Sequence, residues 1–348
     1  MNPEPEWRLD WPTTSGKRLA SASIKAVDAH FQVDEELDLE GLPAELAFDK
    51  KTDLIPGSGE HLFIRIEKRG DNTDYVAREL ARLSGCKPHD IGFCGLKDRH
   101  AVTRQWFSVY RPGMTAADSG FLDAVAELHT VLAACRFPRK LRRGDHQGNR
   151  FDLVLTEVDG DRSWVDQRLG QLQVAGCPNY YGPQRFGWGG NNLRQAVRLR
   201  PGRQRGRNSR TGLYFSAARS WLFNEVLAER VALDNWRNAL TGEPDASGPT
   251  GPLWGDGGTD ATGPQGELER SVVSRHPQLV HVFSETRMKP ERRPLVLFPD
   301  TLSWRWLDET TLALSFGLLP GQFATSVLAD IFTIHDRSGG AAGLAEDA

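Results

Sequence analysis

Residues 91–110 read IGFCGLKDRHAVTRQWFSVY. The two ends of this stretch, 91–94 and 105–110, consist of apolar, aromatic and β-branched residues, a composition typical of strands. Between them, a turn that begins at Gly95 carries the acid Asp98. Four potential cations accompany it: Lys97, Arg99, His100 and Arg104. A lone Lys-Asp pair on a turn is most often a solvated surface pair. Here the flanking strands favour a carboxylate that is held rigidly and displayed beside a polyanion.

Strands and helices follow one another through the first half of the chain, which predicts an α+β fold with a mixed or antiparallel sheet. Alternating or β-branched runs predict strands at 23–27, 31–36, 61–68, 131–137 and 151–158. Helices are expected from Thr73, as the capping residue, to Gly85, and from Ser163 to Gly176.

The pattern changes at about Cys177 and returns near the C-terminus. A helix is expected over 216–233, no regular structure over the glycine- and proline-rich segment 242–266, a strand over 311–318 and a helix over 323–332. This order predicts a discontinuous catalytic domain, 1–177 and 301–348, interrupted by a more helical inserted domain, 178–300.

The composition is that of a globular protein of the cytoplasm. Of the 348 residues, 39% are hydrophobic and 26% charged. No apolar run reaches the roughly 20 residues that cross a bilayer, and the N-terminus lacks the features of a signal peptide. We therefore expect a cytoplasmic protein with no membrane partner. The four cysteines form no Cys-x-x-Cys pair, which predicts buried free thiols.

The distribution of charge favours a nucleic-acid partner, although the net charge is only −3. Residues 136–150 hold six basic residues against the single acid Asp145, and residues 194–210 hold seven arginines and no acid. Acid-poor runs rich in arginine are suited to phosphate contacts. The expected contact residues are Arg142, Arg143, Arg150, Arg185, Arg203, Arg205 and Arg207.

Several motifs resemble those of the TruD family of tRNA pseudouridine synthases. They are the Gly-Leu-Lys-Asp run at 95–98, Lys25-Ala26 with Phe31, Gly-Asn-Arg-Phe at 148–151, Asn-Tyr-Tyr-Gly-Pro-Gln-Arg-Phe-Gly at 179–187, and Phe-Ala-Thr-Ser-Val-Leu at 323–328. The resemblance covers nearly the whole chain, from about Ser23 to Phe332. It implies a pseudouridine synthase catalytic domain with an inserted TRUD domain, 178–300, that contacts tRNA.

The same resemblance implies a site and a reaction. Asp98 would be the nucleophile that turns uridine into pseudouridine at position 13 of tRNA, acting on a flipped-out base. By resemblance, Phe31, Asn149 and Phe323 line the substrate pocket, Phe151 stacks against the base, and Lys25 is the basic partner of Asp98. The family also implies no cofactor, no metal, no protein partner and a monomer.

The residue types suit this chemistry. A carboxylate can attack either the ribose anomeric carbon or the uracil ring and later leave, and a neighbouring cation keeps it ionised. Asn149 offers both a donor and an acceptor to a uracil edge. Each phenylalanine taken alone is more often a core residue, and 179–187 is either a hinge or a packed corner.

Two other functions remain open at this point. One is a non-catalytic RNA-binding or RNA-folding protein, for which the basic segments suffice. The other is a metal-dependent phosphodiesterase that uses Asp98 and His100. The second is disfavoured because no further cluster of histidines and carboxylates supplies the ligands of a two-metal site.

Overall fold

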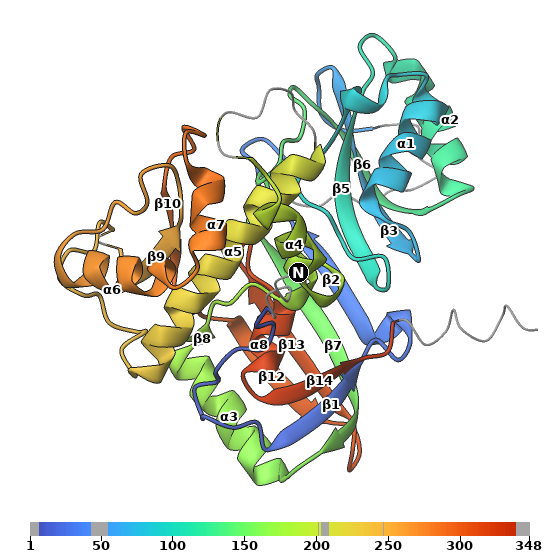
Figure 1. Ribbon diagram of the computed structural model, residues 1–348. Helices are drawn as coiled ribbons and strands as arrows, with labels where there is room; N and C mark the ends of the chain where they lie inside the picture. Colours follow the sequence, from blue (N-terminus) through green and yellow to red (C-terminus); the bar gives the residue numbers. More distant parts are fainter. Residues whose placement is uncertain (1–6, 43–54, 201, 203–208, 246, 339–348) are drawn as a thin grey trace, which may run out of the picture. The chain divides into compact units, whose positions relative to one another are not determined.

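The computed structural model describes residues 7–42, 55–200, 202, 209–245 and 247–338 (Figure 1). These residues form a mixed α+β structure, which confirms the predicted fold class. They divide into two compact units. The sheet unit holds the described residues of 21–159, 300–321 and 334–348, and the helical unit holds those of 1–20, 160–299 and 322–333.

The sheet unit is built on a ten-stranded mixed sheet. Its main path runs in the order β12-β13-β7-β2-β5-β3-β6, with β1 paired to β7 and β14, and β4 paired to β5. The strands β2 and β5 pair in parallel, whereas β3 and β4 run antiparallel to β5. The strands are β1 (Ala20–Ile24), β2 (Phe31–Glu36), β3 (His61–Arg69), β4 (Ile91–Phe93), β5 (Val102–Tyr110), β6 (Thr130–Phe137), β7 (Gly148–Asp159), β12 (Asp300–Trp306), β13 (Leu312–Leu318) and β14 (Phe332–Asp336).

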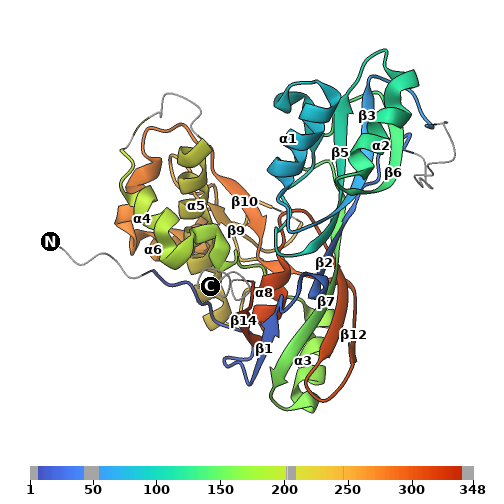
Figure 2. The same cartoon turned by 90° about the vertical axis from the view of Figure 1, so that its right-hand side faces the viewer.

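Two helices cover one face of the sheet at β5, β3 and β6 (Figures 1 and 2). They are α1 (Thr73–Ser84) and α2 (Asp118–Ala126). Their apolar side chains share a core with the strands; Leu80 and Leu122, for example, pack with Ile64 and Phe107. Each such fully buried side chain contributes about 1.5–3 kcal/mol relative to an exposed one. The sequence predicted α1 but not α2.

The start of α1 differs from the prediction in one respect. Asn72, not Thr73, is the capping residue, and its side chain accepts a hydrogen bond from the amide of Tyr75 at 2.8 Å. Thr73 is the first residue of the helix and is fully buried. Because Asn72 provides the cap, the Thr73 hydroxyl is available for other hydrogen bonds. Gly85 ends the helix as predicted, with φ of 70°, a conformation that glycine adopts without strain.

The helical unit is arranged around α5 (Ser209–Ala232), which packs with α4 (Asn191–Val197), α6 (Gly263–Ser274) and β9 (Thr250–Leu253) (Figure 2). Trp221, Phe223 and Leu227 of α5 are buried in its core. The remaining elements are α3 (Arg162–Ala175), α7 (Pro277–Val280), α8 (Ala324–Ala329), β8 (Cys177–Pro178), β10 (Glu291–Pro294) and β11 (Val296–Leu297). Short 3-10 helices cover Asp28–His30, Pro88–Asp90, Thr115–Ala117, Pro183–Phe186, Trp188–Gly190 and His281–Phe283.

The boundaries of the two units differ from those of the predicted domains. The described residues of 1–20, together with 160–177 and 322–333, pack with the helical unit. The ring of Trp7 meets that of Trp221 edge-on at 5.1 Å, and Trp11 stacks on Tyr180 at 5.6 Å. These aromatic contacts tie the N-terminal segment to α5.

Two local predictions were wrong. Segment 242–266 contains β9 and the start of α6, although the sequence was read as irregular there. The expected helix over 323–332 is shorter, because α8 ends at Ala329 and β14 begins at Phe332. The four cysteines are free as predicted; three are buried and Cys86 is half-buried. Among the described helices, none has the length and apolar character of a membrane span.

Candidate active site

Asp98 lies in the loop between β4 and β5, and the predicted hairpin is present. Because β5 pairs with β2, β3 and β4, the loop leaves one of the most firmly held strands of the sheet. The Asp98 side chain is 35% exposed. Its Oδ1 accepts a hydrogen bond from the amide of His100 at 3.0 Å, and its Oδ2 accepts one from Nζ of Lys25. The carboxylate is therefore fixed at both oxygens and still reachable from solvent.

Lys25 is the cation that pairs with Asp98. It follows β1 directly, and its side chain is only 4% exposed. The Nζ atom lies 4.8 Å from the centre of the Phe31 ring and 3.8 Å from Oδ2 of Asp336. Its φ of 57° is uncommon for a residue with a side chain. Lys25 is thus a buried component of the Asp98 site and not a solvated lysine on a strand edge.

These contacts determine the ionisation of Asp98. Partial burial acts to raise its pKa, but the ion pair with Lys25 and the hydrogen bond from the His100 amide outweigh it. The pKa of Asp98 is therefore lowered from its usual value. At neutral pH the group is a carboxylate, which is the form a nucleophile requires.

Phe31 and Phe151 lie on neighbouring strands, β2 and β7. Their ring centres are 6.2 Å apart with edge-on geometry, and Phe151 also stacks on Phe316 of β13 at 5.6 Å. Both predicted rings are less than a tenth exposed. The Phe31 ring lies against the ammonium group of Lys25, the partner of Asp98. The Phe151 ring contacts the rings of Phe31 and Phe316.

Asn149, in β7, is 9% exposed, and its side-chain oxygen has no hydrogen-bond partner among the described residues. Buried polar atoms are nearly always bonded, so an unpaired one needs an explanation. A ligand that donates a hydrogen bond to Asn149 would satisfy it. This is the behaviour expected of a residue that reads the edge of a base.

Phe323 belongs to the helical unit, unlike the other predicted pocket residues. It precedes α8, and its ring lies 5.9 Å from that of Tyr181. Tyr181 belongs to the segment 179–187, which is a packed corner in this unit: Tyr180, Tyr181 and Phe186 are all buried. The role of Phe323 toward the base stays a prediction.

Comparison with known proteins identifies the family. The model of tRNA pseudouridine synthase D (TruD) matches residues 13–193. The chain belongs to the TruD family. A tRNA pseudouridine synthase D of Marinobacter nauticus is 53% identical over 97% of this chain and 98% of its own length. Another, of Cellvibrio japonicus, is 40% identical over 97% of each.

A solved structure supports the fold. The putative tRNA pseudouridine synthase D (TruD) from Methanosarcina mazei superposes with a TM-score of 0.63 and covers 94% of this chain and 96% of its own, at 18% identity. TruD relatives of known sequence and a TruD neighbour of known structure thus agree with the resemblance carried by the motifs.

The predicted RNA-contacting arginines of this TruD chain differ in their exposure and in the groups that they contact. Arg142 and Arg143 are exposed, and Arg143 lies over the Phe93 ring at 4.3 Å. Arg150 bonds to Ser315, and Arg185 lies over Tyr181 at 5.1 Å. Arg203, Arg205 and Arg207 lie outside the described residues. Arg136, counted in the basic run, is buried in an ion pair with Asp118 and is not a surface cation.

The sequence analysis missed a buried ion pair beside the loop. Glu35 is 1% exposed and accepts hydrogen bonds from Nζ of Lys97 and from the amide of Trp106, the latter at 3.2 Å. A signal was present: Phe31, Val33 and Glu35 share one face of β2, and the first two are apolar. An acid on that buried face needs a cation, and Lys97 supplies it.

Cys94 and His146 gather with Glu35, with their ligand-type atoms within 4.8 Å of one another. Two observations weigh against a metal there. Lys97 already places an ammonium group on the carboxylate. Burial, reinforced by the nearby Glu35, raises the pKa of the Cys94 thiol to about 12, which disfavours the thiolate that binds metals. Neither Asp98 nor His100 belongs to this cluster of described residues.

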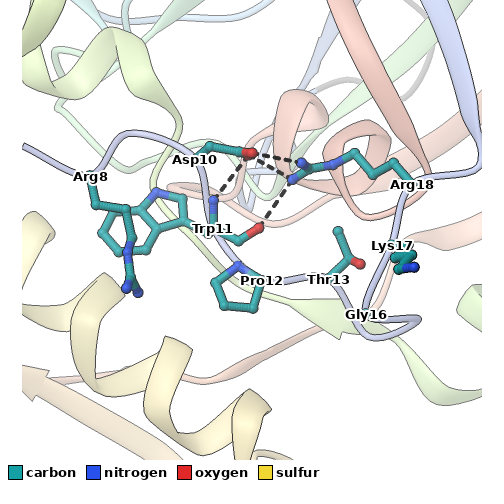
Figure 3. Close-up of a pocket in the computed structure, with 8 residues that line it drawn as sticks. All are labelled: Arg8, Asp10, Trp11, Pro12, Thr13, Gly16, Lys17 and Arg18. Carbon is teal, nitrogen blue, oxygen red and sulfur yellow. Dashed lines mark hydrogen bonds and ion pairs between the residues drawn. The ribbon is translucent and has the colours of Figure 1, made fainter.

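Of two hollows in the structure, one adjoins Asp98 and the other does not. A cavity of about 580 Å³ is lined by Lys25 and His100, which flank Asp98, and by Arg337. A smaller hollow, of about 300 Å³, lies in the N-terminal segment of the helical unit (Figure 3). There Arg18 bonds to Asp10 and to the carbonyl oxygen of Trp11 (Figure 3), and its Nε donates to the carbonyl oxygen of Ala329, so its cation is already satisfied. The larger cavity is the one that adjoins the candidate chemistry.

Proposed function

We propose that this chain is an isomerase that converts uridine to pseudouridine at position 13 of tRNA, with Asp98 as the nucleophile acting on a flipped-out base. The observation that carries the proposal is the ionised, partly exposed Asp98 carboxylate bonded to the buried Lys25. Membership of the TruD family supports the same reaction. A non-catalytic RNA-binding protein would have no use for a carboxylate held in this way.

The reaction balances without an external reagent. The bond between uracil N1 and the ribose anomeric carbon breaks, the base turns, and a bond forms from uracil C5 to the same carbon. The C5 proton is lost and N1 gains a proton. Asp98 attacks either the anomeric carbon or the uracil ring and leaves again, so it is regenerated in each turnover. The target base must leave the helical stack first, which a tRNA-binding surface makes possible.

The proposal is tested with the purified chain and an unmodified tRNA transcript that carries tritium at C5 of its uridines. Pseudouridine formation releases that tritium to water, and carbodiimide derivatisation followed by primer extension locates the product. We expect release of one equivalent and a single stop at position 13. Binding of tRNA without tritium release would favour the RNA-binding alternative, and strand cleavage would favour the phosphodiesterase.

Replacing Asn149 with leucine is expected to separate activity from stability. Loss of the amide removes the contacts to the uracil edge, and kcat/KM falls about 10²-fold. The melting temperature stays the same or rises, because the unpaired buried side-chain oxygen of Asn149 costs about 1–3 kcal/mol. Tritium release and thermal unfolding are measured on the same preparation. An unchanged kcat/KM would show that Asn149 does not read the base.

Replacing both Arg142 and Arg143 with glutamine is expected to weaken tRNA binding without changing kcat. If each contacts one phosphate, the slope of log K against log[salt] falls by about 1.5–2 in total. Filter binding at several salt concentrations measures this slope. Arg82, exposed on α1 and paired with Glu79, is the matched control and should leave the slope unchanged. Equal slopes in the double variant and the wild type would remove these residues from the tRNA surface.

A further inference from the structure

The main chain just before Asp98 is bonded to two buried side chains from different elements. Nε2 of Gln105, in β5, donates to the carbonyl oxygen of Gly95 at 2.6 Å. The hydroxyl of Thr73, at the start of α1, donates to Oε1 of Gln105 at 3.0 Å and accepts from the amide of Lys97 at 3.0 Å. Both side chains are fully buried. Together they close a ring of hydrogen bonds across the Gly95–Lys97 segment.

A third buried group meets the loop at Asp98 itself. Nζ of Lys68, in β3, donates to the carbonyl oxygen of Asp98 at 3.4 Å and to that of Asp71 at 2.6 Å. The residue is 2% exposed. Burial lowers the pKa of Lys68 to about 8, with Asp71 and Asp98 acting in the opposite direction. Three successive anchors, at Gly95, Lys97 and Asp98, therefore hold the main chain of the loop.

We propose that the hydrogen bond between Thr73 and Gln105 positions Asp98 for catalysis, so that both are positioning residues of the reaction; this inference rests on the proposed function. The Thr73 hydroxyl is not needed to cap α1, because Asn72 caps it. It bonds instead to the side chain of Gln105 and to the amide of Lys97, the residue before Asp98. Without it, the Lys97 amide and the side-chain oxygen of Gln105 lose their partner at a buried position.

The consequence for Asp98 is geometric. Its two bonds, to Lys25 and to the His100 amide, require the loop to stay in one pose. A shift of about 1 Å at a reacting group, even one caused by a distant change, is enough to lower a rate about 10²-fold. The same shift lengthens the contact with Lys25 and so raises the pKa of Asp98 toward its usual value. Rate and pKa should therefore change together.

The test compares Thr73→Val, which keeps the shape and removes the hydroxyl, with Thr73→Ser, which keeps the hydroxyl. We expect Thr73→Val to lower kcat for tritium release about 30- to 100-fold, with the Kd for tRNA within about twofold of the wild type. The acid limb of the kcat profile should move to higher pH. Thr73→Ser should restore most of the rate. Should Thr73→Val fail to fold, Gln105→Met removes the same bridge from the other side.

Asp98 is also titrated by NMR in the RNA-free protein, which tests the inference independently of activity. An upward shift of its pKa in Thr73→Val, absent in Thr73→Ser, is the expected result. A wild-type pKa and a wild-type kcat in Thr73→Val would overturn the positioning role, as would equal losses in both Thr73 variants. If the wild-type protein releases no tritium, the proposed function fails, while the NMR titration still decides whether the hydrogen bond controls Asp98.

Discussion

Asp98→Asn lowers the rate of pseudouridine formation by more than about 10⁴-fold, the scale of loss seen when a catalytic nucleophile is removed. The amide has nearly the same shape as the carboxylate but cannot attack carbon as an anion. Tritium release from C5-labelled tRNA under single-turnover conditions measures the effect. Single turnover is chosen because it reports the chemical step rather than product release.

The control for this variant is binding. The Kd for tRNA should stay within about twofold of the wild type, since affinity for a polyanion comes mainly from cations that neutralise phosphates and not from a carboxylate. Some loss of melting temperature is expected, because the buried Lys25 loses its closer carboxylate and, among the described residues, keeps Asp336 at 3.8 Å as its ion-pair partner. A folded Asp98→Asn variant with wild-type activity would refute the nucleophile. Loss of binding equal to the loss of rate would instead assign Asp98 to docking.

Lys25→Met should lower kcat about 10²- to 10³-fold at neutral pH, the usual cost of removing one charged partner from a reacting centre. The variant loses the strongest influence that lowers the pKa of Asp98. The pKa of Asp98 then rises, because partial burial raises it and the ion pair with Lys25 no longer lowers it. Asp98 is protonated at a higher pH than in the wild type, so the acid limb of the rate profile moves upward in pH.

The matched variant is Lys25→Arg, which retains the cation. It should keep the acid limb near that of the wild type even if the longer side chain lowers the maximal rate. The pH dependence of kcat from about pH 4 to 8 measures both variants. If Lys25→Met lowers kcat but leaves the acid limb in place, Lys25 acts on the substrate and not on the ionisation of Asp98.

The parts of the site that are local in sequence were predictable. The apolar runs on both sides of Asp98 predict the hairpin, because each strand is specified by its own residues, and Phe31–Glu36 is found as expected. The motif around Asp98 likewise needs no long-range information. Hence the central carboxylate and the two strands that flank its loop follow from residues 91–110 alone.

The partners of Asp98 depend on contacts between distant segments. Lys25 lies 73 residues away from Asp98, and Lys97 lies 62 residues from Glu35. From the residues alone, several cations near Asp98 in the sequence were equally plausible partners. The family resemblance named Lys25, and the fold brings it to Asp98. Thr73 was predicted as the cap because threonine is a common N-cap residue, but Asn72, one residue earlier, is a better one. The buried role of its hydroxyl emerges only when α1 packs beside the loop.

The prediction of no regular structure over the glycine-rich segment 242–266 was wrong because one of its glycines is needed for packing. Glycine was read as a sign of irregular chain, yet Gly251 lies within β9. A Cβ at that position would come within 2.8 Å of Leu295 and 3.0 Å of Phe223. Glycine is therefore required there for close approach to the core, a use that composition alone does not distinguish from flexibility.

The most direct measurement maps pseudouridine in tRNA from cells that lack this protein and carry either the wild-type chain or Asp98→Asn, expressed at equal levels. Carbodiimide derivatisation and primer extension should give a stop at position 13 with the wild-type chain and none with Asp98→Asn. A stop at position 13 with the Asp98→Asn chain, or its persistence in cells without the protein, would contradict the assignment of Asp98 as the nucleophile of this reaction.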